Sequence, residues 1–319
     1  MPAPAQLHRR AIFWLIAGTA VWGLSFPLVK VLHLRHSQDD WMLSCWLLVI
    51  RCFFAALLLA IWQPAMLRHI TRREWMQSLG LILFGGPGLL LQAQGLSSTN
   101  ASTSAFLTQF YCVLLPLWAC IRTRRPPSSR ILLATLLVLI GMGLLAGFDW
   151  RSFRLGRGET LTILASVCFT GQISLLEMPR FADNRSSTIT ILSLAGTALL
   201  AAAFALPATP QPLTYLSQWL TWPDLLLLSV LTFGCTLFSY LMMNRWQKFV
   251  SGTEAGLVYC LEPVCAAAFA LVLPAWLSQA CSVSYSNEQL TSNLIQGSLL
   301  VTLANVLLHW PGRNSPHTS

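Results

Sequence analysis

Two long stretches without a formally charged residue constrain the fold of this chain more than any other feature. Residues 75–121 form a stretch of 47 residues and residues 186–223 a stretch of 38. About 20 apolar residues in a helix cross the hydrocarbon core of a bilayer, so each stretch has room for two crossings. Each also contains one polar break, at residues 97–104 and 207–222, where turn-forming Ser, Asn or Pro gather. We therefore expect a pair of membrane helices in each stretch.

The remaining sequence continues this pattern. The 319 residues are 55% hydrophobic and 10% charged, whereas a soluble domain carries about 25% charged residues. The sequence therefore predicts an all-α polytopic membrane protein with about ten transmembrane helices. The expected spans lie near residues 11–32, 42–62, 75–96, 101–121, 131–147, 160–177, 187–206, 224–244, 253–273 and 293–310.

The basic residues predict how these spans are oriented. With ten spans, 14 of the 20 Lys and Arg residues fall in the segments on one side, which also holds both termini. The positive-inside rule then places both termini in the cytoplasm, and we expect a multi-pass protein of the bacterial inner membrane. The net charge of +9 arises from these short clusters, so nucleic acid is not an expected partner.

An internal repeat is visible when the chain is shifted by 147 residues. Pro116 then falls on Pro263, and the match continues over four spans before the offset grows to 156 at the last pair. We expect two five-helix repeats, at residues 11–147 and 160–310. Five is an odd number, so the second repeat would enter the membrane from the opposite side and the repeats would be inverted. Apolar composition alone is the other explanation of so weak a similarity.

Three segments resemble motifs of the EamA-type members of the drug/metabolite transporter superfamily. They are the Trp22-Gly23 segment of the first span, the Arg51 segment of the second and the Glu262-Pro263 segment of the ninth. The resemblance covers residues 11–310 and implies a ten-span carrier with a central cavity that exports or exchanges small metabolites. The glutamate that many family members carry after the fourth and ninth spans is absent here.

Glu262 is the leading candidate for a functional group inside the membrane. An ionisable side chain at that depth is costly unless it has a partner, a wet cavity or a function. The neighbouring Pro263 leaves the carbonyl of Tyr259 without its helical donor. A carboxyl beside a disturbed backbone suits a proton or a cationic group of a solute. The alternative is a structural glutamate that neighbouring polar groups satisfy.

Arg51 and a set of polar and aromatic side chains complete the candidate cavity. Arg51 could bind an anionic group of a solute or pair permanently with a buried acid. Amides and hydroxyls can orient a solute or join helices, and aromatic rings can line a cavity or simply pack. The polar candidates are Ser25, Gln92, Gln109 and Gln172, and the aromatic candidates are Trp22, Phe26, Tyr111, Tyr240 and Tyr259.

Glycines and prolines inside the spans are candidate hinges. Proline removes a helical donor and glycine adds backbone freedom, which predicts bending, although small residues also serve close helix packing. The hinge candidates are Gly86, Pro87, Pro116 and Pro263.

Cys281 is the one cysteine of nine in a polar loop, and the Cys and His spacings match no metal site, so we expect no metal and no cofactor.

These features favour a secondary transporter over other classes of membrane protein. The sequence contains no hydrolase or metalloprotease motif and no nucleotide-binding motif, so we expect neither an enzyme nor a primary pump. The expected function is export of a small metabolite, amino-acid-like or amphiphilic and drug-like, by alternating access around a central cavity. The alternatives are a channel and a non-transporting scaffold or receptor. The expected partners are a small-molecule substrate and the lipid bilayer, and a homodimer remains open.

Overall fold

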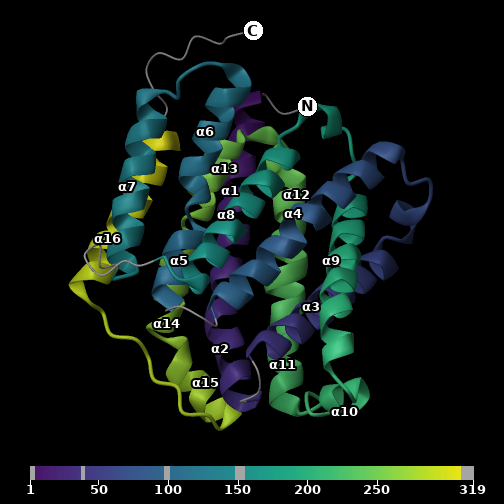
Figure 1. The fold of residues 1–319 in the computed structure, drawn as a ribbon. Coiled ribbons are helices and arrows are strands. Elements are labelled where there is room, and N and C mark those ends of the chain that lie inside the picture. The colour runs from purple at the N-terminus through teal and green to yellow at the C-terminus, as the bar shows by residue number, and fades with distance from the viewer. Residues whose placement is uncertain (1–3, 37–39, 97–100, 148–154, 310–319) are drawn as a thin grey trace.

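The fold is a bundle of helices that run up and down between two ends (Figure 1). The computed structural model describes residues 4–36, 40–96, 101–147 and 155–309, and these contain no strand. The first half comprises α1 (Pro4–Gly23), α2 (Ser25–His36), α3 (Asp40–Trp62), η1 (Pro64–Leu67), α4 (Arg72–Leu96), α5 (Ala101–Thr108), α6 (Tyr111–Thr123) and α7 (Ser129–Leu145).

The second half contains more interruptions than the first. It comprises α8 (Arg157–Leu176), η2 (Pro179–Phe181), α9 (Ser186–Ala208), α10 (Pro212–Ser217), α11 (Trp222–Val230), η3 (Leu231–Phe238), α12 (Ser239–Trp246), η4 (Gln247–Phe249), α13 (Gly252–Tyr259), α14 (Glu262–Ala270), α15 (Leu273–Cys281) and α16 (Ser292–His309). η3 is a π-helix, whereas η1, η2 and η4 are short 3-10 turns.

The predicted membrane fold is confirmed. Eight helical stretches among the described residues are long and apolar enough to cross a bilayer, and α7 and α16 are shorter apolar helices. Each of these ten falls on one predicted span. Large apolar side chains point outward from several of them, such as Phe53 and Leu199, which are 52% and 73% exposed. A surface of this kind needs lipid around it, so the protein is an integral multi-pass membrane protein.

The helices pair across the two halves of the chain in a symmetric pattern. α3 packs along α9, α6 along α13 and α7 along α16. α1 packs against η3 and α12, and α4 packs along α8. If the two halves of the chain are exchanged, the contact of α1 with η3 and α12 becomes the contact of α8 with α4. The other three pairs each join equivalent spans of the two halves, so the exchange leaves them unchanged. The boundaries at residues 11–147 and 160–310 stay a prediction, which this pairing supports.

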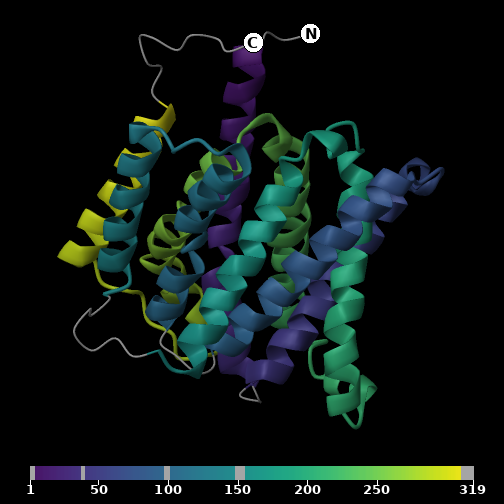
Figure 2. The same cartoon turned by 45° about the horizontal axis from the view of Figure 1, so that its top comes forward.

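The α7–α16 pair meets through two glycines, at one edge of the bundle (Figure 2). A Cβ atom on Gly297 would lie 2.5 Å from the carbonyl oxygen of Gly141, and one on Gly141 would lie 2.8 Å from that of Gly297. Small residues at a membrane helix interface allow backbones to approach this closely. The match of Gly141 with Gly297 in the sequence repeat is therefore also a contact in space.

We expect Gly297→Ala to destabilise this pair, since neither backbone can yield without moving a helix. The loss of stability should be about 1–3 kcal/mol, as for other overpacked interfaces, and a thermal unfolding curve in detergent measures it. Leu299→Ala is the control on the same helix, because Leu299 is 64% exposed and should matter little. Equal melting temperatures for Gly297→Ala and the unmodified protein would contradict this account of the interface.

One prediction about the loops is wrong. Cys281, which we placed in a polar loop, is the last residue of α15 and is 4% exposed. Apolar residues before it, including Leu277, continue the helix and pack into a hydrophobic cluster with the end of α2. The amphipathic α15 was missed because its nine residues are too few to read as a span.

Candidate functional site

Three spans are broken near their middle. The break between α1 and α2 falls at Leu24, that between α5 and α6 at residues 109–110, and that between α13 and α14 at residues 260–261. Pro263 is the second residue of α14, where its missing N–H leaves no helical bond unmade. The breaks are short, because Phe110, Cys260 and Leu261 keep right-handed helical backbone angles. Interrupted helices are a common setting for solute and ion sites in transporters.

Glu262 lies where these breaks come together. It is the first residue of α14, and its carboxyl lies near the side-chain amide of Gln109 in the α5–α6 break. A Cβ atom on Gly23, the last residue of α1, would lie 2.9 Å from the carbonyl oxygen of Glu262. Tyr111 and Tyr240 also lie within electrostatic range of Glu262. The structure thus brings groups from three other predicted spans close to Glu262.

Aromatic rings form one side of this group. Trp22 contacts Tyr240 edge-on with ring centroids 5.2 Å apart, and it contacts Tyr259 in the same manner at 6.5 Å. The Tyr259 hydroxyl donates to Oε1 of Gln247 at 2.8 Å, and Nε2 of Gln247 donates to the Ile173 carbonyl at 2.7 Å. Tyr259 is therefore held by the packing of α8 and is buried, whereas Trp22 is half-buried.

Arg51 is held by the π-helix. Its Nε donates to Oγ1 of Thr236 at 2.9 Å, and that hydroxyl donates to the carbonyl of Leu231, five residues earlier. π-turns are frequent at functional sites because they re-aim side chains. This contact joins α3 to η3 and supports the packing role of Arg51 over a role in binding a solute.

Thr236→Val tests that role of Arg51. Valine keeps the shape of the side chain but removes the acceptor of the guanidinium Nε. We expect a loss of about 1–3 kcal/mol in stability, as for a buried donor left unsatisfied, with an unchanged KM for any transported solute. Thermal unfolding and transport kinetics of the same preparation measure both quantities. A changed KM with unchanged stability would instead assign Arg51 to the solute.

The other polar and aromatic candidates lie around this centre rather than in it. Gln92 donates to Oγ1 of Thr108 at 3.2 Å and so joins α4 to α5. Gln172 lies against Gly85, with its Oε1 2.9 Å from where a Cβ atom would stand. Ser25 begins α2 directly after the break, and Phe26 is 42% exposed. Their contact with a solute stays a prediction.

The candidate hinges differ in their surroundings. α4 runs without interruption through Gly86 and Pro87, and α6 does so through Pro116. A Cβ atom on Gly86 would lie 2.6 Å from the side chain of Leu200, so close packing is one reason for glycine there. Pro263 is the candidate that stands at an actual break. Bending during a transport cycle stays a prediction for all four.

Two cavities are described, and Glu262 lines neither of them. A space of about 10 Å³, enough for about one water molecule, touches Gln172 and Tyr240. A larger groove of about 510 Å³ shares no lining residue with the Glu262 group. It lies between the end of α3, the start of α9 and η3–α12, lined by Trp62, Gln63, Arg185, Ser186, Ser187, Phe233, Leu237, Phe238, Leu241, Met242 and Arg245.

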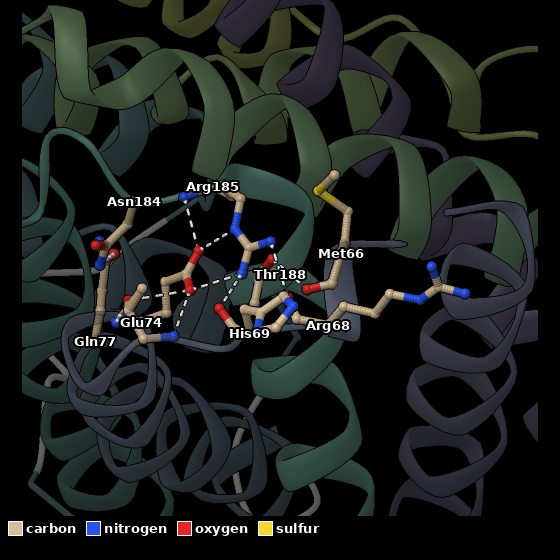
Figure 3. Close-up of polar contacts among 9 residues, drawn as sticks. Met66, Arg68, His69, Glu74, Gln77, Asn184, Arg185 and Thr188 are labelled. Atoms are coloured by element: carbon tan, nitrogen blue, oxygen red, sulfur yellow. Dashed lines mark hydrogen bonds and ion pairs between the residues drawn. The ribbon is translucent and has the colours of Figure 1, made fainter. Parts of the chain in front are cut away.

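An ion pair at the end of the bundle where α1 begins was missed by the sequence analysis (Figure 3). Glu74 is 1% exposed, and its Oε1 accepts from Nε of Arg185 at 2.7 Å while its Oε2 accepts from Nη2 at 2.9 Å. Thr71 donates to Oε2 from both its backbone N–H and its hydroxyl. The bond to Glu74 raises the pKa of Arg185 above its usual value. We call Glu74–Arg185 the near pair.

A second ion pair at the opposite end was also missed. Asp224 is fully buried, and its Oδ1 accepts from Nε of Arg35 at 2.6 Å while its Oδ2 accepts from Nη2 at 3.3 Å. The hydroxyl of Thr221 donates to Oδ2 at 2.6 Å, and Nη1 of Arg35 donates to the Cys281 carbonyl at 2.6 Å. We call Arg35–Asp224 the far pair. The signal was the threonine three residues before each acid, which marks a helix start.

Comparison with known proteins agrees with the family expected from the motifs. Residues 9–147 match the EamA-like transporter family. An uncharacterized transporter of Archaeoglobus fulgidus is 22% identical over 288 residues, which are 90% of this chain and 82% of that protein. A solved crystal structure of another protein shares the fold, with a TM-score of 0.69 and 14% identity over 95% of this chain and 97% of that one. Residues 9–147 are therefore similar to the EamA-like transporter family, and the chain as a whole has a multi-pass membrane fold that it shares with the solved structure.

Proposed function

We propose that the protein is a secondary transporter that exports a small metabolite by alternating access around Glu262. The observation that carries this proposal is the meeting of three helix breaks at the half-buried Glu262, whose neighbour Gln109 is a neutral amide. Interrupted helices of two repeats around a mid-membrane group are the arrangement in which transporters bind solutes and coupling ions. The EamA-like domain supports transport as the general activity.

The groups at this centre favour a solute with an amino group. A carboxylate attracts a cationic amine, and the faces of Trp22 and Tyr240 can contact the same cation or an apolar part of the solute. An amino-acid-like or amphiphilic, drug-like amine fits both features. Glu262 would then hold either the solute or a proton, which makes exchange of one for the other possible.

Export follows from this exchange and from the direction of the proton gradient, which a bacterial inner membrane maintains with an excess of protons outside. Protons from outside reach Glu262, displace the amine toward the outside and are released into the cytoplasm. The bias of basic residues toward the side that holds the termini supports a cytoplasmic location of that side.

Proteoliposomes loaded with a pool of labelled amines and amino acids test the proposal. The proton gradient is imposed with the acidic side outside, where the released solute appears. We expect it to make at least one compound leave these vesicles faster than it leaves loaded liposomes that contain no protein. The same vesicles without a gradient provide the baseline. The pool covers amino acids and amphiphilic amines. Equal release from vesicles with and without the protein would therefore contradict the proposed substrate class.

A further inference from the structure

The near pair and the far pair are built from the same parts. Each acid is the third residue of its helix, Glu74 in α4 and Asp224 in α11. Each accepts a side-chain hydrogen bond from a threonine three residues earlier, Thr71 or Thr221. Each also accepts from Nε and Nη2 of an arginine, one bond to each carboxylate oxygen. The far pair has one further partner, because Nε2 of His36 lies 3.2 Å from Oδ2 of Asp224. The shared parts point to a common origin in the repeat.

Sequence positions relate the two pairs by one constant offset. Asp224 follows Glu74 by 150 residues, and Arg185 follows Arg35 by 150 residues. The helices that carry the acids, α4 and α11, also begin 150 residues apart. This offset is close to the 147 residues that the spans suggested. Exchange of the halves therefore turns the near pair into the far pair.

The two pairs lie at opposite ends of the bundle. Arg185 directly precedes α9, whose 23 residues rise about 34 Å at 1.5 Å per residue. In Figure 1, α9 leads from that end to α10, which lies at the end where α2, α11 and α15 meet. The far pair joins these last three elements, through Arg35, Asp224 and the Cys281 carbonyl.

We propose that the near pair and the far pair are the two gates of the carrier, each opening at its own end of the bundle while the other stays closed. The inference rests on the proposed transport function. Inverted repeats give two open states of nearly equal energy because each breaks the contacts that the other keeps. In this structure both pairs are formed, the space beside Tyr240 is about 10 Å³, and the groove of about 510 Å³ lies beside Arg185 of the near pair.

An ion pair suits this role because its cost of separation depends on water. Removing one partner of a buried pair leaves a charge that is strongly destabilised, whereas opening an end of the bundle hydrates both partners together. The arginine side chains are already partly exposed, at 17% for Arg35 and 34% for Arg185, while the acids are buried. Water therefore has a path to the arginine side of each pair.

A native cysteine reports the opening of the far pair. Cys281 is 4% exposed, its carbonyl accepts from Arg35, and its burial raises the pKa of its thiol, so a maleimide should label it slowly. In detergent-purified protein, we expect Asp224→Asn to speed labelling of Cys281 by about tenfold, a typical coupling between a local contact and a two-state opening. Peptide mass spectrometry identifies the labelled residue, and Cys281→Ser shows the background.

Glu74→Gln is the matched variant at the other end. If the pairs are alternating gates, it favours opening of the near end and slows labelling of Cys281 below the rate in the unmodified protein. If Asp224→Asn leaves the labelling rate unchanged, or if Glu74→Gln leaves it unchanged or raises it, the pairs are structural clamps and the inference is wrong. Gel filtration and thermal unfolding identify variants that fail to fold, in which case Thr221→Ala weakens the far pair more gently and carries the same expectation.

This experiment needs no transported solute. If no substrate is found, the labelling rates can still be interpreted. If the gates are assigned wrongly, a positive transport assay remains valid. The two proposals can thus fail independently.

Discussion

Glu262→Gln is expected to abolish transport that a proton gradient drives, so that flux falls to the level of liposomes without protein. Glutamine keeps the length of the side chain and can still bond to Gln109, but it neither takes up a proton nor attracts an amine. Its neutral amide also removes the cost of a carboxylate at membrane depth, a few kcal/mol on insertion scales, so stability should not fall. Proteoliposome flux under an imposed gradient and thermal unfolding measure the two expectations.

Glu288→Gln is the control for that change. Glu288 is exposed and lies in the segment between α15 and α16, outside the spans, so the same chemical substitution there should leave transport intact. Full gradient-driven flux in Glu262→Gln would show that the carboxyl is structural, which is the alternative that the sequence left open.

Gly23→Ala is expected to have the second largest effect. An added Cβ atom would lie 2.9 Å from three atoms of the α14 segment: the Ala266 nitrogen, the Cys265 Cβ and the Glu262 carbonyl oxygen. Two of these are backbone atoms, so α1 must move away from α14 at the place where Glu262 stands. We expect a loss of about 1–3 kcal/mol in stability and a loss of most transport activity.

Gly18→Ala provides the matched control on the same helix. A Cβ atom on Gly18 would lie 3.4 Å from the Cβ of Met242, which is ordinary van der Waals contact. The methyl group should therefore be accepted with little change in melting temperature or transport rate. If Gly23→Ala and Gly18→Ala behave alike, the close approach of α1 to α14 has no functional consequence.

The sequence predicted the spans well because one physical constraint dominates them. The hydrocarbon core of a membrane admits long apolar segments only where their backbone bonds internally, so an apolar stretch such as α9 must form a helix. The importance of Glu262 could be predicted for the same reason, since a lone acid in an apolar stretch is conspicuous. Its partner Gln109 could be included only as one polar residue among several, because the contact joins different spans.

What the sequence did not predict depends on contacts between distant segments. Arg51 and Thr236 are 185 positions apart, and Arg35 and Asp224 are 189 apart. The acids of the near and far pairs stand at helix ends, where a charged residue also fits simply because it faces water. Only the preceding threonines, read as helix starts in both halves at the same offset, could have indicated them.

The central claim is that solute crosses by alternating access rather than through a continuous pore. Counterflow tests it most directly: proteoliposomes filled with unlabelled substrate are diluted into a trace of labelled substrate, without any proton gradient. A carrier exchanges one molecule for another, so we predict a transient accumulation of label inside above its outside concentration. Label that only approaches equilibrium, at a rate independent of the unlabelled substrate, would contradict the account and indicate a channel.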